Sequence, residues 1–233
     1  MRLRPKDIAL ILVAVGASAT CIRLGFWQLD RLGQRRALNS LYEQRFASPS
    51  IDLATVASFD SLEFTRAHAS GVYDYERQLV AVMRRLNGVL GVHIVTPLEV
   101  SNGVAVLVNR GWVSSADGRT VNLRSLTERD SARVEGYLTV PIAPGRPSAG
   151  GRGDWPAYVV RVSPQLHAAR FPYRILPVVL VRGRSASVNE LLPIPPPEAT
   201  DGPHLSYALQ WFAFALIALI GTAVLLRAEV RDT

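Results

Sequence analysis

The chain has 233 residues and a formal net charge of +7. A net positive charge of this size could indicate nucleic-acid binding. However, Lys6 is the only lysine and the arginines are scattered, which argues against a polybasic binding arm. We therefore expect no nucleic-acid partner. Cys21 is the single cysteine, which excludes an intrachain disulfide, a CxxC redox pair and a cysteine-based zinc site.

The N-terminal apolar segment is long enough to cross a membrane. No charged residue lies between Ile8 and Ile22, and apolar residues continue after Arg23 as far as Leu29. A helix of about 21 residues rises roughly 31 Å, which is close to the hydrocarbon thickness of a bilayer. A cleaved signal peptide would begin in a similar way, but no A-x-A-like site with a polar mature start follows. We therefore predict an uncleaved membrane anchor over residues 8–29.

A second apolar segment runs from Leu205 to Leu226 without a charged residue, and it predicts a transmembrane helix over residues 204–226. Basic residues precede the first apolar segment and follow the second, so the positive-inside rule puts both termini in the cytoplasm. The predicted organisation is a cytoplasmic N-terminus (1–7), the first span (8–29), an extracytoplasmic domain (30–203), the second span (204–226) and a cytoplasmic C-terminus (227–233).

The region between the spans predicts a β-rich domain. Short β-like runs are separated by turn residues, and Leu86-Asn87-Gly88 and Ser101-Asn102-Gly103 are typical of hairpin turns. Two successive hairpins imply a meander, so we expect a mostly antiparallel small barrel or sheet with short helices near Leu123–Arg129 and Gln165–Arg170, which makes the protein membrane α+β. The expected strands are Thr65–Tyr73, Gln78–Met83, Val89–Pro97, Val104–Val113, Arg133–Val140, Ala157–Val162 and Arg174–Val181.

Motifs at both ends of this region resemble the Surfeit locus protein 1 family. Leu24-Gly25-Phe26-Trp27-Gln28-Leu29-Asp30-Arg31 resembles the L-G-x-W-Q-L-x-R exit from the family's first helix, and His204-Leu205-Ser206-Tyr207-Ala208-Leu209-Gln210-Trp211-Phe212 resembles the start of its second helix. The family's internal motifs follow in the same order as GVYD (71–74), GVHIVTPL (91–98) and VLVNRGWV (106–113). The resemblance therefore covers nearly the whole chain, with a weaker match over residues 117–200.

The resemblance implies an assembly factor for cytochrome c oxidase that receives or presents haem a for insertion into the haem-copper subunit. The implied partners are the haem-copper catalytic subunit, haem a synthase as a second candidate, and membrane lipid, all at a bacterial inner (plasma) membrane. The resemblance implies no catalysis, and the sequence contains no GxSxG, HExxH, SxxK or P-loop motif. One alternative is a membrane scaffold that holds an oxidase assembly intermediate by protein contacts without binding haem. Another is a tethered extracytoplasmic sensor or binding module.

The two helix-end motifs are expected to face each other at the outer membrane interface. On a helix, His204, Tyr207, Ala208 and Trp211 share one face. A neutral imidazole can ligate haem iron, aromatic rings can stack on a porphyrin, and arginine can pair with propionates. The alternative interpretation is an interfacial aromatic belt in which the histidine caps the helix. The candidate haem a site comprises His204 as iron ligand, with Tyr207, Trp211, Trp27 and Arg31.

Three other features have a structural interpretation. His68, His93 and His167 are expected to be ordinary domain histidines rather than ligands. Asn109-Arg110-Gly111-Trp112 either ends a strand with a core tryptophan and a structural arginine, or forms an exposed edge that meets the membrane or an oxidase subunit. Leu192-Pro193-Ile194-Pro195-Pro196-Pro197 predicts an extended, stiff spacer that returns the chain to the membrane.

Overall fold

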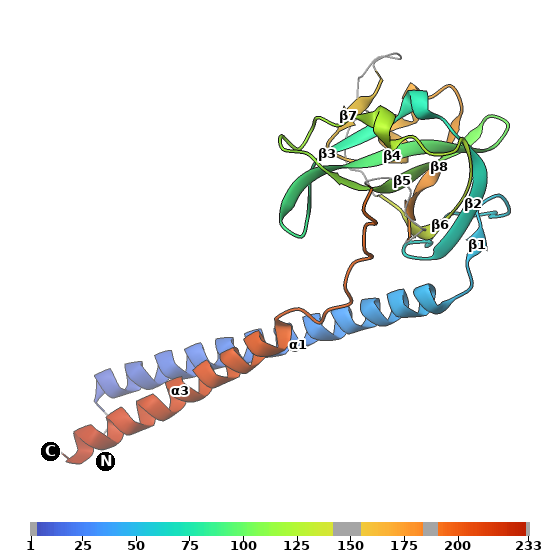
Figure 1. The fold of residues 1–233 in the computed structure, drawn as a ribbon. Helices are drawn as coiled ribbons and strands as arrows, with labels where there is room; N and C mark the ends of the chain where they lie inside the picture. Colours follow the sequence, from blue (N-terminus) through green and yellow to red (C-terminus); the bar gives the residue numbers. More distant parts are fainter. Residues whose placement is uncertain (1–3, 142–154, 184–190, 232–233) are drawn as a thin grey trace. The chain divides into compact units, whose positions relative to one another are not determined.

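The computed structural model describes residues 4–141, 155–183 and 191–231 and divides into two compact units (Figure 1). The first unit comprises Met1–Glu43 and Glu198–Thr233, and the second comprises Gln44–Pro197. The first unit contains helix α1 (Pro5–Ala47) as far as Glu43 and helix α3 (His204–Arg231), with the segment from Glu198 that leads into α3. Both helices contain stretches that are long and apolar enough to cross a membrane, judged by length and composition.

Helix α1 continues well past its apolar segment. Its 43 residues include a polar continuation from Asp30 to Arg45, beyond the predicted membrane span over residues 8–29. No proline follows Pro5 within α1, and the continuation is rich in leucine, glutamine and arginine, which are strong helix formers. The chain therefore has no local reason to break between the two segments.

The second unit is built on one mixed sheet of eight strands in the order β1-β2-β6-β8-β5-β4-β3-β7. Because β2 also pairs with β4, the strands β2, β6, β8, β5 and β4 form a closed ring (Figure 1). The strands are β1 (Ile51–Asp52), β2 (Arg66–Tyr73), β3 (Leu79–Leu86), β4 (Val89–Ser101), β5 (Val104–Ser114), β6 (Ser131–Thr139), β7 (Ala157–Val159) and β8 (Arg174–Arg182). Short helices are η1 (Tyr75–Arg77), η2 (Leu123–Leu126), α2 (Pro164–His167) and η3 (Ala168–Arg170).

The expectation of a mostly antiparallel sheet is wrong, because three strand pairs are parallel: β1–β2, β3–β7 and β5–β8. The two predicted hairpins are present as β3–β4 and β4–β5. Hairpin turns can be recognised from a few adjacent residues, whereas parallel neighbours are joined by long crossovers. The crossover from β5 to β8 contains β6, β7 and the helices η2, α2 and η3, so no local pattern announces the pairing.

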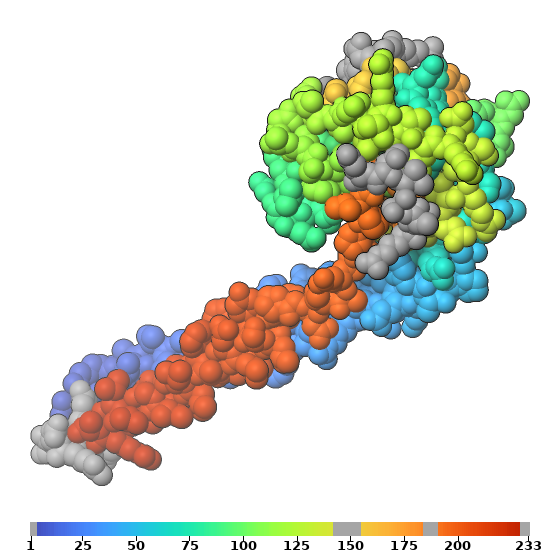
Figure 2. Space-filling model, in the orientation of Figure 1, coloured from blue at the N-terminus to red at the C-terminus, as the bar shows by residue number. Residues whose placement is uncertain are grey.

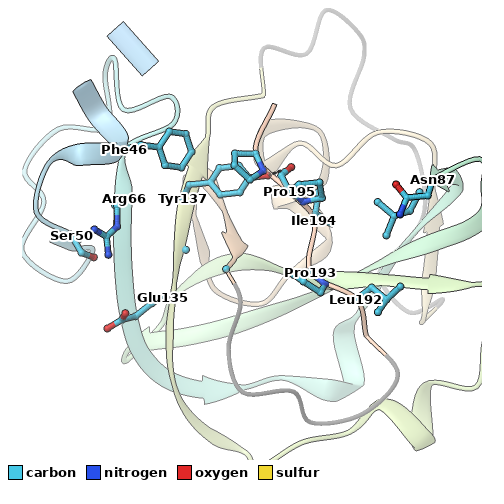
Figure 3. A pocket seen from close by; sticks show the side chains of 14 residues that line it. Phe46, Ser50, Arg66, Asn87, Glu135, Tyr137, Leu192, Pro193, Ile194 and Pro195 are labelled. Atoms are coloured by element: carbon cyan, nitrogen blue, oxygen red, sulfur yellow. Dashed lines mark hydrogen bonds between the residues drawn. The ribbon is translucent and has the colours of Figure 1, made fainter. Parts of the chain in front are cut away.

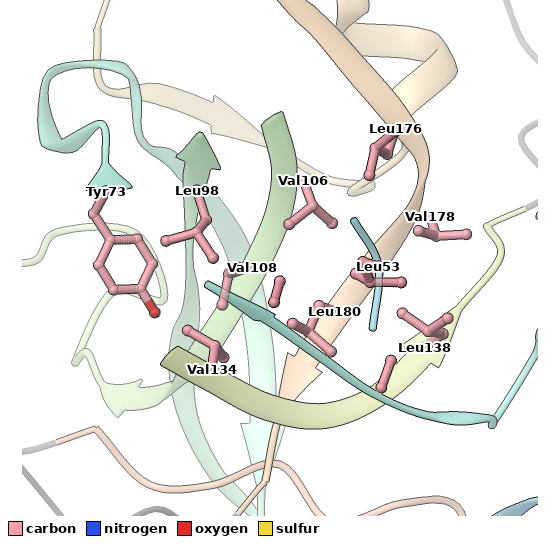
Figure 4. Close-up of a cluster of buried hydrophobic side chains, with 12 residues drawn as sticks. Leu53, Tyr73, Leu98, Val106, Val108, Val134, Leu138, Leu176, Val178 and Leu180 are labelled. Atoms are coloured by element: carbon pink, nitrogen blue, oxygen red, sulfur yellow. The ribbon is translucent and has the colours of Figure 1, made fainter. Parts of the chain in front are cut away.

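Two apolar clusters lie on opposite faces of β5. Val106 and Val108 belong to the cluster inside the ring, with Leu98 and Leu180 among their neighbours (Figure 4). The alternate residues of β5, including Leu107, belong to a second cluster. Successive side chains of a strand point to opposite faces, so β5 is buried on both sides, which explains its nearly continuous apolar sequence.

Beyond this apolar stretch, β5 carries a buried arginine. Arg110 is 1% exposed, and its Nη2 donates to Glu128 Oε1 at 2.8 Å. The rings of Tyr73 and Tyr75 lie 5.4 and 5.2 Å from its Cζ, and Arg182 also donates to Glu128, at 2.7 and 2.9 Å. Burial is the largest single influence on the pKa of Glu128 and would raise it, but the hydrogen bonds and charges of the two arginines outweigh burial and hold that pKa below its usual value. Glu128 is therefore the anion that compensates two arginines taken out of water.

The Asn109–Trp112 motif is part of the core rather than an exposed edge. Arg110 is buried as described, and Trp112 is 4% exposed. Trp112 and Leu192 exchange two backbone hydrogen bonds of 2.8 Å each. Gly111 has φ of 142°, and a Cβ on it would lie 2.6 Å from Leu192 O. Glycine is required here because the spacer that follows the sheet passes directly over its Cα.

Candidate functional site at the paired helix ends

Helices α1 and α3 lie side by side (Figure 2), and they pack along a seam in which most of the buried residues are small. Buried positions on α1 recur every seven residues from Ser18 onward, and buried Ala208 and Ala215 of α3 have the same spacing. A repeat of seven is typical of helices that cross at a small left-handed angle, and small side chains let their backbones approach closely. The buried α1 residues are Ala14, Ser18, Gly25, Leu32 and Asn39.

A tight contact lies at Gly25. A Cβ at this position would be 2.5 Å from Cε1 of Phe212, so the phenyl ring occupies the space that a side chain would need. Phe26 meets the same ring edge-on, with centroids 5.4 Å apart. Further along, Ser18 Oγ donates to Ala215 O at 3.1 Å. The two helix-end motifs thus fit each other as complementary surfaces.

His204 begins α3 and bonds to Gln28 of α1. Its Nδ1 lies 2.8 Å from Gln28 Oε1. A carbonyl oxygen only accepts hydrogen bonds, so with this amide orientation Nδ1 carries the proton and Nε2 carries a lone pair. Within the described residues, Nε2 has no hydrogen-bond partner. This is the tautomer of metal-ligating histidines, which donate their other ring N–H to an acceptor that orients the ring.

Polar residues of α1 hold the chain just before His204. Arg36 donates to Asp201 Oδ2 from Nε and Nη2 at 2.9 and 2.7 Å, while Arg35 and Asn39 donate to Thr200 O at 3.2 and 3.1 Å. The hydrogen bonds and charge of Arg36 hold the pKa of Asp201 below its usual value. Exposed ion pairs contribute little stability. Their effect here is positional, because they fix the place on α1 at which α3 begins.

The other predicted site residues lie on the outer surfaces of the two helices. Tyr207 is 46% exposed and Trp27 is 49% exposed. Arg31 places its Cζ 5.6 Å from the centre of the Trp27 ring and donates to Gln34 at 2.9 Å. Trp211 is half-buried and meets Phe214 edge-on. The structure therefore joins His204 to Gln28 and Arg31 to Trp27, and it leaves the rings of Tyr207 and Trp27 accessible.

Histidines of the sheet unit have partners there. His93 Nδ1 lies 3.3 Å from Asn109 Nδ2, and burial lowers the pKa of His93 to about 4, so it is neutral at pH 7. His68 bonds to Ser50, and His167 Nε2 lies 2.8 Å from a backbone oxygen. Across the described ranges, no three His, Cys, Asp or Glu residues gather into a possible metal site.

Sequence reasoning missed Gln28, Gly25 and Ser18 as site-forming residues. Gly25 and Gln28 lie within the first helix-end motif, which did not reveal which residue each would contact. The seven-residue spacing from Ser18 to Asn39 runs through four different residue types, so only the burial of these positions reveals it.

Comparison with known proteins agrees with the motifs. The SURF1 family model matches residues 15–216, a range that contains Gly25, Gln28, His204 and Phe212. An uncharacterised SURF1-like protein of Mycobacterium bovis is 26% identical over 98% of this chain and 86% of its own length. A SURF1-like protein of Rickettsia felis is 28% identical over 90% and 92%, respectively. Surfeit locus protein 1 of Takifugu rubripes is 31% identical over 52% of this chain and 55% of its own length.

We predict that Gly25→Leu separates the helices and that Gly16→Leu does not. A side chain at Gly25 collides with Phe212, whereas a Cβ at Gly16 meets nothing within 4 Å. The two substitutions add the same apolar side chain to the same helix, so their difference isolates the seam.

The measurement is disulfide trapping of Ser18→Cys with Ala215→Cys in a Cys21→Ser background. The crosslinked fraction should fall several-fold with Gly25→Leu and stay at the parent level with Gly16→Leu. Equal trapping in both variants would contradict the packing described for Gly25.

Proposed function

This chain belongs to the SURF1 family, and from that membership we propose that it is an oxidase assembly factor that receives or presents haem a at His204. Membership of the family implies a role in cytochrome c oxidase assembly, and the family is one of assembly factors rather than known enzymes. The observation that carries the haem proposal is the imidazole geometry. Gln28 accepts from Nδ1 and leaves the Nε2 lone pair of His204 directed away from that bond.

The residues at the helix ends fit a haem. A haem supplies its iron with four porphyrin nitrogens, so the protein needs to provide only an axial nitrogen, here Nε2 of His204. Gln28 would hold the imidazole in one tautomer and one orientation. The exposed ring of Tyr207 and the half-buried ring of Trp211 would cover apolar porphyrin surface. The accessible Trp27 ring would flank the porphyrin, and Arg31 would pair with a propionate. The proposed partners are the haem-copper catalytic subunit as recipient and haem a synthase as donor.

We also propose that α1 and α3 cross the bacterial inner membrane with the sheet unit outside. Apolar side chains of α3 such as Leu209, Leu216 and Ile217 are more than half exposed, and lipid would cover them. Basic residues at both chain ends favour a cytoplasmic location for the termini. Relatives in Mycobacterium and Rickettsia show that bacteria have homologues of this chain, which is compatible with a bacterial inner membrane.

A reporter that works only in the cytoplasm tests this topology. Fused after Thr233 it should be active, and inserted near Gly150 it should be inactive, because the positive-inside rule puts the first position inside and the second outside. An enzyme active only outside the cytoplasm should give the reverse pattern at the same two positions. Activity of the cytoplasmic reporter near Gly150 would overturn the orientation.

The haem proposal predicts graded losses of haem affinity. His204→Ala should abolish the iron–imidazole bond, and Gln28→Leu should lower affinity roughly 10- to 100-fold, which is typical when the acceptor behind a ligating histidine is removed. Gln28→Glu keeps an acceptor for Nδ1–H and should retain binding. Gln210→Leu is the matched control, because Gln210 is an exposed glutamine of α3 and is not one of the proposed haem residues.

The measurement is an optical titration of the full chain in detergent with haem a, paired with oxidase activity in cells that produce each variant. Equal abundance of the variant proteins is the folding control. If His204→Ala binds haem as tightly as the parent and supports full oxidase activity, the ligand assignment is wrong. The scaffold function, in which the Gln28–His204 bond serves only to join the helices, would then be favoured.

A further inference from the structure

A cavity of about 660 Å³ lies in the sheet unit, and none of its lining residues belongs to the proposed haem site (Figure 3). This volume falls within the range of small-molecule sites in proteins. One wall is formed by β2 and β6, and another by the proline-rich spacer from Leu192 to Pro196. Leu86 and Asn87, at the β3–β4 turn, also line the cavity.

The spacer wall is fixed in place by the sheet. Leu192 is held by its two backbone hydrogen bonds to Trp112, and Tyr137 Oη donates to Pro195 O at 3.3 Å. Proline has no N–H, so Pro193, Pro195 and Pro196 cannot form a strand ladder with a partner chain. An occupant would therefore be held by side-chain contacts, which favours a small molecule over an added peptide strand.

The middle of the cavity is apolar and rigid. The ring centroids of Phe46 and Tyr137 lie 5.7 Å apart. Phe64 stacks on Tyr137, with ring centroids 6.1 Å apart. Burial raises the pKa of Tyr137 to about 12, so its hydroxyl stays neutral. Ile194 and Leu192 continue this apolar surface along the spacer (Figure 3).

One end of the cavity carries a cation. Arg66 lies directly opposite Tyr137 in the β2–β6 register, so both side chains share one face of the sheet. Glu135, which also lines this end, pairs with Arg133 at 3.4 Å. In the portion of the chain that the structure describes, the Arg66 guanidinium has neither a hydrogen bond nor an ion pair. Figure 3 shows Arg66 and Ser50 together at this end, with Asn87 at the other.

We propose that this cavity binds a long-chain carboxylate, with its carboxylate on Arg66 and its acyl chain along Tyr137, Ile194 and Leu192 towards Leu86. The charge at one end and the elongated apolar surface beyond it match the two parts of such a molecule. This binding site is additional to the haem site and does not depend on it.

The experiment is photo-crosslinking of the full chain in detergent with a diazirine-bearing analogue of palmitic acid, followed by peptide mapping. Label is expected on peptides that contain Tyr137 or Leu192–Pro196. Labelling of α1 and α3, which any apolar probe should give, serves as the internal reference. The methyl ester of the same probe lacks the negative charge and should lose the cavity label while keeping the helix label.

Matched variants separate specific binding from partitioning. Arg66→Gln should lower the cavity label about tenfold, as expected for loss of a charge-assisted hydrogen bond. Arg174→Gln removes another exposed arginine at the start of a strand in the same unit and should change nothing. Ile194→Trp should fill the cavity and lower the label while preserving Arg66.

Cavity label that is absent from the parent, or unchanged in both Arg66→Gln and Ile194→Trp, would overturn the proposal. Haemin at equal concentration should leave the cavity label in place. If haemin displaced the probe, the cavity would bind a porphyrin carboxylate instead of a long-chain carboxylate, which would contradict the proposal. His204→Ala should keep the cavity label, so failure of the haem proposal and failure of this one are distinguishable.

Discussion

The close packing of the Phe212 ring on Gly25 is the contact from which the geometry of the candidate site follows. Because Gly25 has no side chain, the Phe212 ring packs directly on the α1 backbone, and Gln28, three residues further along α1, can reach His204 at 2.8 Å. Ala208 lies between these two contacts on α3 and is fully buried. A larger residue at Gly25 would push the helices apart and leave the imidazole without the acceptor that sets its tautomer.

A second glycine has a similar role in the sheet unit. At Gly111 the backbone of Leu192 occupies the space of a Cβ, and the spacer is thereby held against β5. Arg110, the preceding residue, points into the interior and is neutralised by Glu128. One short motif therefore supports the core on one side and fixes a wall of the carboxylate cavity on the other. This explains why its arginine and tryptophan are buried instead of forming an exposed binding edge.

Local patterns predicted what local interactions determine. The hairpins around Asn87 and Asn102 were predicted from turn residues, and the β5 strand from its apolar run. The parallel pairing of β5 with β8 was not, because the partner strand lies beyond a long crossover and is selected by packing of the closed ring. The site shows the same division. His204 was proposed as a ligand from its place on one helix face with Tyr207 and Trp211, and that role stays a prediction. Its contact with Gln28 could not be predicted, because Gln28 lies 176 residues away in the sequence and only folding brings the two together.

The most direct test of the account is nitrogen NMR of the full chain labelled with ¹⁵N-histidine, in which the four histidines are assigned by single substitutions. The ¹⁵N shifts report which ring nitrogen carries the proton. The account predicts that the neutral imidazole of His204 carries its proton on Nδ1, and that this tautomer preference is lost in Gln28→Leu. A proton on Nε2, or an unchanged tautomer without Gln28, would show that the glutamine does not prepare the imidazole for iron and would contradict the central claim.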